Sequence, residues 1–221
     1  MKHIPVLVSL AVYNLVQNTL LRKRGYVIGN LAATGIALLW ARRSGLEWDD
    51  LGMDSKHLVK GIALGTLASA SASGSAVAIG NHENVQTVVD DERLKGLESG
   101  EIRYRLMVRF PLGTALFEEV LFRGVLPAVF RHHTSARADL ISAGAFAAWH
   151  VIPTAHAVSS NSRGRSLSRN RKATLVLVGS AAAGLAGLGL SGMRRASSSL
   201  AAPWMTHATF NGLAFLKAIR S

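Results

Sequence analysis

The sequence has no cysteine, so disulfides, thiolate metal ligands and cysteine nucleophiles are all excluded. It is also poor in charge: 17% of its 221 residues are Asp, Glu, Lys or Arg, against roughly 25% in an ordinary soluble domain. Acidic residues are especially scarce, with 13 Asp and Glu against 25 Lys and Arg, so the formal net charge is +12. Because the basic residues cluster between long uncharged stretches instead of covering one exposed face, we expect no nucleic-acid partner.

Hydrophobic residues make up 49% of the chain, and they gather in seven segments that are apolar on all sides. A helix needs about 20 such residues to cross a membrane. The segments are 4–21, 26–41, 61–81, 106–130, 140–160, 173–193 and 196–216. A soluble helix would instead show a single apolar stripe. The sequence therefore predicts an all-α fold, a polytopic membrane bundle of about seven transmembrane helices with its active site buried in the bundle core.

The first segment could instead be a signal peptide, but it lacks a small-x-small cleavage motif and its charges follow it at residues 22–24. If seven spans alternate, this basic loop, the basic loop at 163–172 and the C-terminus share one side. The positive-inside rule makes that side cytoplasmic. The Ala- and Arg-rich composition favours a bacterial source. We expect a multi-pass protein of the bacterial plasma membrane, in contact with membrane lipids.

A polar stretch of mixed charge, residues 82–105, follows the third apolar segment. We therefore divide the chain into residues 1–104, with the first spans and this connecting segment, and a core at residues 105–221. The core contains every ionisable residue found inside a span.

Ionisable residues inside a span cost a few kcal/mol each, so they usually line a cavity or pair with one another. Three spans of the core bring polar groups into the apolar phase. They are Glu118, Glu119 and Arg123 in the fourth span, His150 in the fifth, one turn after Phe146, and His207 and Asn211 in the last. One hydrated pocket in the bundle core would satisfy all three sets.

The two adjacent glutamates differ in whether their own helix offers a partner for the side chain. Glu119 and Arg123 are four residues apart and therefore neighbours, which favours a structural ion pair. Glu118 points about 100° away from Glu119 and has no partner on its own helix. A single buried histidine is more often a hydrogen-bonded core residue than a catalyst, and only the convergence of three spans favours a site.

A carboxylate, imidazoles and an amide in one pocket suit hydrolysis by water. The carboxylate acts as general base, and His and Asn donors stabilise an oxyanion. The alternative is a zinc site made by Glu118, His150 and His207, although the sequence has no HExxH motif.

The three motifs resemble, in order, those of the CPBP family. These are the CAAX-protease and bacteriocin-processing (or abortive-infection) intramembrane endopeptidases, relatives of the type II CAAX prenyl endopeptidase. The motifs are EExxxR from Glu118 to Arg123, FxxxH from Phe146 to His150, and HxxxN from His207 to Asn211. The resemblance covers about residues 105–219.

The resemblance implies a role for each catalytic residue. Glu118, helped by His150, would activate the attacking water, and His207 and Asn211 would stabilise the oxyanion. The substrate would be a membrane-bound peptide or protein, membrane-associated or lipidated.

The resemblance also implies that Glu119, Arg123 and Phe146 support the site, and that no cofactor is needed, as in a glutamate-type protease. Three alternatives stay open at this point. They are a zinc-dependent version of the protease, a non-catalytic scaffold or immunity protein of the same family, and a transporter that uses the same buried groups.

Overall fold

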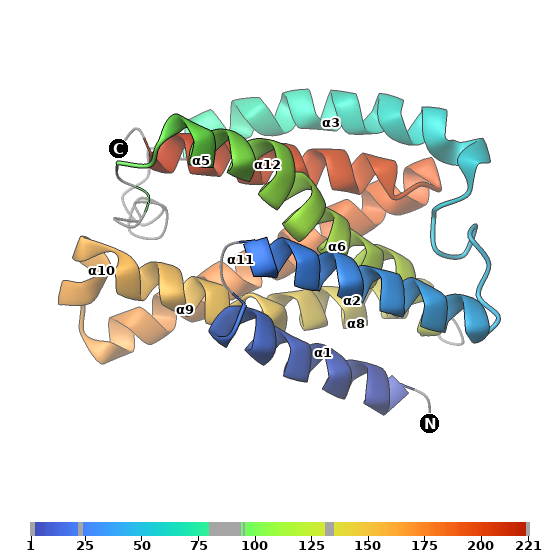
Figure 1. Cartoon of the computed structure of the whole chain (residues 1–221), viewed down its shortest axis with the longest axis horizontal. Helices are drawn as coiled ribbons and strands as arrows, with labels where there is room; N and C mark the ends of the chain where they lie inside the picture. Colours follow the sequence, from blue (N-terminus) through green and yellow to red (C-terminus); the bar gives the residue numbers. More distant parts are fainter. Residues whose placement is uncertain (1–2, 22–23, 80–93, 95, 131–134, 220–221) are drawn as a thin grey trace.

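The computed structural model describes residues 3–21, 24–79, 94, 96–130 and 135–219, and the regular elements it describes are all helical. The all-α prediction is therefore confirmed. Each of the seven apolar segments corresponds to one helix or to a string of helices (Figure 1). Most of the polar stretch at 82–105, residues 82–93 and 95, lies outside the described residues. The elements before this stretch are α1 (His3–Thr19), α2 (Arg24–Arg43), the short 3₁₀-helix η1 (Ser55–His57) and α3 (Leu58–Ile79).

The fourth apolar segment forms most of one continuous helical stretch, residues 99–129, which we call the rod, and two parts of this stretch are π-helical. Its elements are α5 (Ser99–Tyr104), η3 (Arg105–Leu116), α6 (Phe117–Glu119), η4 (Val120–Val125) and α7 (Leu126–Val129), of which η3 and η4 are π-helical. In a π-helix each carbonyl accepts from the residue five positions later. Pro127 has no N–H to give the carbonyl of Phe122, and the Ser142 hydroxyl on α8 donates to that carbonyl instead. The neighbouring helix thus satisfies a group that the π-turn leaves open.

The remaining elements are α8 (Ser135–Trp149), α9 (Val151–Ser160), α10 (Ser162–Ser166), α11 (Arg169–Ser197) and α12 (Ala201–Ala218). Residues 140–160, expected to form a single span, are divided at His150 (φ −83°, ψ −5°). The cause is Pro153, which cannot donate a hydrogen bond to the carbonyl of Trp149 four residues earlier. Asn14 Nδ2 on α1 donates to that carbonyl at 3.0 Å. The break therefore falls at one of the predicted site residues.

Small residues allow close packing between the helices of the core. α12 packs against α3, η3 and α11, while α11 also covers α8 and α9, and α2 lies on η3. A Cβ atom on Gly65 of α3 would lie 3.1 Å from Ala202 Cα, and one on Gly184 of α11 would lie 3.2 Å from the Ala143 carbonyl oxygen. Such close backbone approach is how helices pack without a hydrophobic driving force in lipid.

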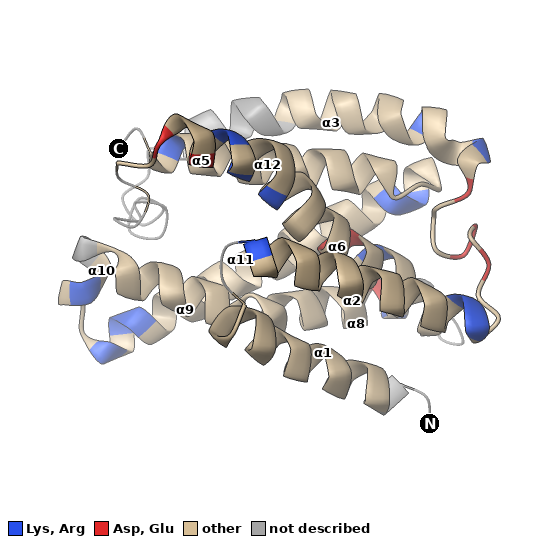
Figure 2. Cartoon of the chain, viewed as in Figure 1, with Lys and Arg blue, Asp and Glu red and all other residues tan. Residues whose placement is uncertain are grey.

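The charges lie mainly at the two ends of the bundle. Figure 2 shows Lys and Arg near the helix ends, while the long sides of α1, α2 and α3 are almost free of charge. Residues 163–172, expected to form a loop, belong to α10, the turn after it and the start of α11. Figure 1 shows this region and the C-terminus at one end of the long axis and the N-terminus at the other.

Among the helices of the described residues, α11 alone is long and apolar enough to pass as a membrane span. Only 22% of its apolar window is buried, so α11 is unlike the core helix of a soluble protein. Large apolar side chains are also exposed on other helices, among them Val8 and Val12 on α1, Ile36 on α2 and Leu67 on α3.

Candidate active site

Two adjacent carboxylates lie in the centre of the bundle, on α6. Glu118 is 4% exposed and Glu119 is 1% exposed. The flanking residues of the rod, Phe117 and Val120, are fully buried and anchor this turn in the core. Isolated carboxylates at such depth would be costly, so their partners decide what the site can do.

Glu119 forms the predicted ion pair and has a second partner from a distant helix. Its Oε1 accepts from Arg123 Nη1 at 3.2 Å, which confirms the expected pairing along the helix. The same oxygen is 2.7 Å from Nδ1 of His207 on α12. Removing one member of a buried pair strands the other, at a cost of roughly 3–5 kcal/mol. This cluster therefore fixes α12 against the rod.

Glu118 has one oxygen that is held and one that is available. Its Oε1 accepts a hydrogen bond from the indole Nε1 of Trp149 at 3.1 Å. Its Oε2 is 3.7 Å from His207 Nε2 and accepts no hydrogen bond among the described residues. The indole orients the carboxylate, and the second oxygen keeps a lone pair for a ligand or a water.

Phe146 is packed among the polar groups of the site. Its ring lies under the Arg123 guanidinium, with Cζ 4.1 Å from the ring centroid. The same ring makes edge contacts with two imidazoles. Its centroid lies 4.3 Å from that of the His150 ring and 6.1 Å from that of the His207 ring. Phe146 therefore packs against both histidines and against Arg123.

The tautomer of His150 follows from its hydrogen bond. Its Nδ1 is 2.9 Å from the carbonyl oxygen of Phe146. Because a carbonyl can only accept, Nδ1 carries the proton, and in the neutral ring Nε2 is left as an acceptor. His150 is thus set up to accept a proton or a hydrogen bond through Nε2.

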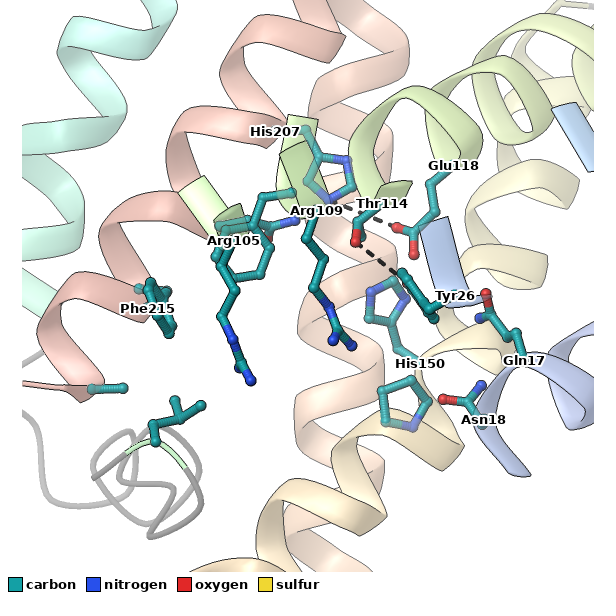
Figure 3. A pocket seen from close by; sticks show the side chains of 16 residues that line it. Gln17, Asn18, Tyr26, Arg105, Arg109, Thr114, Glu118, His150, His207 and Phe215 are labelled. Atoms are coloured by element: carbon teal, nitrogen blue, oxygen red, sulfur yellow. Dashed lines mark hydrogen bonds and ion pairs between the residues drawn. The ribbon is translucent and has the colours of Figure 1, made fainter. Parts of the chain in front are cut away.

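The two histidines, Glu118 and Asn211 line one cavity of about 430 Å³. Figure 3 shows the Glu118 carboxylate beside His207, with His150 in the same pocket. All four residues predicted as catalytic therefore share a pocket, while Glu119, Arg123 and Phe146, predicted as supporting, are absent from its lining. The other lining residues are Gln17, Asn18, Tyr26, Leu94, Arg105, Arg109, Phe110, Thr114, Pro153, Ala214, Phe215 and Ala218.

Several residues of the site were not predicted from the sequence. The donor to Glu118 is Trp149, next to the predicted His150, and its indole was not expected to take part. The first two helices contribute Gln17, Asn18 and Tyr26 to the cavity. The signal that would have found Gln17 and Asn18 is the same one that marked Glu118, a polar side chain inside an apolar segment.

No three His, Asp or Glu side chains within the described residues are grouped closely enough to hold a metal ion. The zinc alternative requires Glu118, His150 and His207 together, and these three do not form such a group. The donor set of the described residues therefore does not fit a zinc ion.

One comparison with known proteins gave a match. Residues 102–213 match the model of the family described as type II CAAX prenyl endopeptidase Rce1-like. The match includes every residue of the three motifs, from Glu118 to Asn211. No curated protein and no solved structure matches the chain.

Proposed function

The chain belongs to the Rce1-like type II CAAX prenyl endopeptidase family, and we propose that it is an intramembrane endopeptidase of the glutamate type. The family is membrane-embedded and acts on protein or peptide substrates. The observation that carries the proposal is the state of Glu118. It is a buried carboxylate in the cavity lining, with one oxygen bonded to Trp149 and the other buried without a hydrogen-bond partner among the described residues.

Glu118 serves as the general base. Its Oε2 takes a proton from a water in the cavity, and His150 Nε2 accepts a hydrogen bond from the same water. The resulting hydroxide bonds to the carbonyl carbon of the scissile peptide, and the carbonyl oxygen becomes an oxyanion. The C–N bond then breaks, and the proton held by Glu118 passes to the leaving amine. One water is consumed, and a new carboxyl end and a new amino end are formed.

His207 and Asn211 supply the donors for the oxyanion. If Nδ1 of His207 donates to Glu119, Nε2 carries a proton only in the imidazolium form. The role of His207 therefore requires the imidazolium, and the two carboxylates beside it are the counterions that this form needs. The Asn211 side chain, which lines the same cavity, adds an amide donor.

The outer surface of the bundle supports a membrane location. We propose that the seven helical stretches cross a bacterial plasma membrane, with the exposed apolar side chains of α1, α2, α3 and α11 facing lipid tails. The motif-bearing core at 105–221 would hold the chemistry. The cavity extends from Glu118 towards Arg105 and Ala218, near the start of the rod and the end of α12. That end also holds the C-terminus and α10 (Figure 1), so a peptide would enter from the cytoplasmic side.

The proposal is tested by cleavage of a peptide library with the purified full-length protein in detergent micelles. Glu118→Gln keeps the shape of the side chain but removes the base, and His150→Ala removes the second acceptor. Glu47→Gln, a change at an exposed glutamate, is the control. We expect cleavage by wild type and control, loss in both site variants, and no effect of a chelator. Cleavage lost with chelator and restored by zinc would contradict the metal-free mechanism. Full activity in Glu118→Gln would contradict the proposed base.

A further inference from the structure

Arg109 is a cation in the wall of the cavity that the proposed chemistry does not use. It lies on η3, on the same rod as Glu118, and both line the cavity (Figure 3). No carboxylate of the described residues lies within ion-pair distance of Arg109. A guanidinium in a pocket partly closed to water is stabilised by an anion, so the missing counterion needs an explanation.

Arg105, one turn earlier on the same wall, shows the contrast. Its Nε donates to Glu101 Oε1 at 2.7 Å, and its Cζ lies 5.6 Å from the centroid of the Phe215 ring. Arg105 therefore already has its own carboxylate. Of these two arginines in the cavity wall, Arg109 is the one left to bind an anion from outside the chain.

The Arg109 side chain is held in a position suited to binding. Its Cζ lies 4.6 Å from the centroid of the Tyr26 ring, and the Tyr26 hydroxyl is 3.3 Å from Thr114 Oγ1. Stacking on the aromatic face leaves the edges of the guanidinium free. Those edges present paired N–H donors, a geometry that matches the two oxygens of a carboxylate.

We propose that Arg109 binds a carboxylate of the peptide substrate, so that the enzyme selects peptides with a negative charge close to the scissile bond. This inference rests on the proposed function. Arg109 and Glu118 are nine residues apart, so they are separated along the helix by no more than about 13 Å at the α-helical rise of 1.5 Å per residue, and by less because η3 is π-helical. An extended peptide covers that length in about four residues. The carboxylate is either the C-terminal one or an Asp or Glu side chain within that reach.

Binding of dansyl-labelled trileucine tests the inference without requiring turnover. The full-length protein in neutral detergent micelles is titrated with the free acid, with the amide, and with an amide that carries one added Glu. A charge-assisted bidentate contact predicts about 10- to 100-fold tighter binding of the acid than of the amide by wild type. Arg109→Gln should bind both equally. Arg103→Gln, the same change at an exposed arginine outside the cavity lining, should retain the preference.

The other outcomes are equally informative. If the Glu-bearing amide binds as tightly as the acid, any carboxylate satisfies Arg109. If it binds like the plain amide, the C-terminal carboxylate is the ligand. Equal binding of acid and amide by wild type, or a preference that survives in Arg109→Gln, would overturn the inference. So would displacement of the acid by an equal concentration of phosphatidylglycerol, which would assign Arg109 to a lipid phosphate. Cleavage without charge preference would leave the proposed function standing while this inference fails.

Discussion

Replacing Gly187 by alanine tests the packing that holds the site. Gly187 lies on α11 against the polar cluster, and a Cβ atom there would be 2.9 Å from Arg123 Nη2 and 3.1 Å from Phe146 Cδ1. Carbon atoms pack best at about 3.5–4.0 Å, so the added methyl is too close to both side chains. Arg123 cannot easily move, because it is buried and bonded to Glu119.

Gly189 provides the matched control, since a Cβ atom there meets nothing within 4 Å. Both substitutions gain the same helix propensity, up to about 1 kcal/mol. The difference between the two variants therefore isolates the cost of overpacking, typically about 1–3 kcal/mol. This corresponds to a midpoint about 2–12 °C lower for Gly187→Ala than for Gly189→Ala in a chain of this size.

Thermal unfolding in detergent, followed by circular dichroism, measures this difference directly. Peptide cleavage at a temperature where both variants are folded provides the second readout. We expect Gly187→Ala to be slower, because a displaced Arg123 disturbs Glu119 and, through it, His207. Equal midpoints and equal cleavage rates in the two variants would refute the packing described here.

Three further predictions concern side-chain donors around the site. Trp149→Phe removes the indole N–H that orients Glu118, and we expect the cleavage rate to fall by about tenfold or more while the protein remains folded, as measured by kinetics and circular dichroism. Asn14→Leu removes the side-chain donor to the Trp149 carbonyl at the helix break, and we expect the free energy of unfolding to fall by about 1–3 kcal/mol. An unchanged free energy of unfolding in chemical denaturation would contradict the explanation of the break. Ser142→Ala removes the donor to the Phe122 carbonyl and should lower the free energy of unfolding by a similar amount. An unchanged free energy of unfolding would indicate that water satisfies the carbonyl equally well.

Local features of the sequence were sufficient for the helices and for one contact of the site. The apolar segments coincide with helices because an uninterrupted apolar run has few other ways to satisfy its backbone in lipid. The Glu119–Arg123 pair was predictable because residues four apart on a helix are neighbours. The number of membrane crossings stays a prediction, because α11 alone among the described helices passes the test of length and composition.

Contacts between distant helices were beyond sequence reasoning. The bond between His207 and Glu119 depends on how α12 packs against the rod, and no local spacing encodes that. The π-helical stretches are equally non-local, because a side chain of α8 satisfies the Phe122 carbonyl in one of them. The break at His150 was predictable from Pro153 in the sequence. The side chain that donates to the open Trp149 carbonyl at this break was not, because Asn14 lies on the distant helix α1.

The most direct test of Glu118 as the general base is the single-turnover cleavage rate of Glu118→Gln beside wild type and Glu47→Gln, with the fold of each checked by circular dichroism. The reporter is the library peptide that wild type cleaves best. We predict that Glu118→Gln is folded but cleaves at least about 100-fold more slowly, the lower end expected for losing a general base, while Glu47→Gln matches wild type. A folded Glu118→Gln protein that cleaves at the wild-type rate would contradict the assignment of Glu118 as the base.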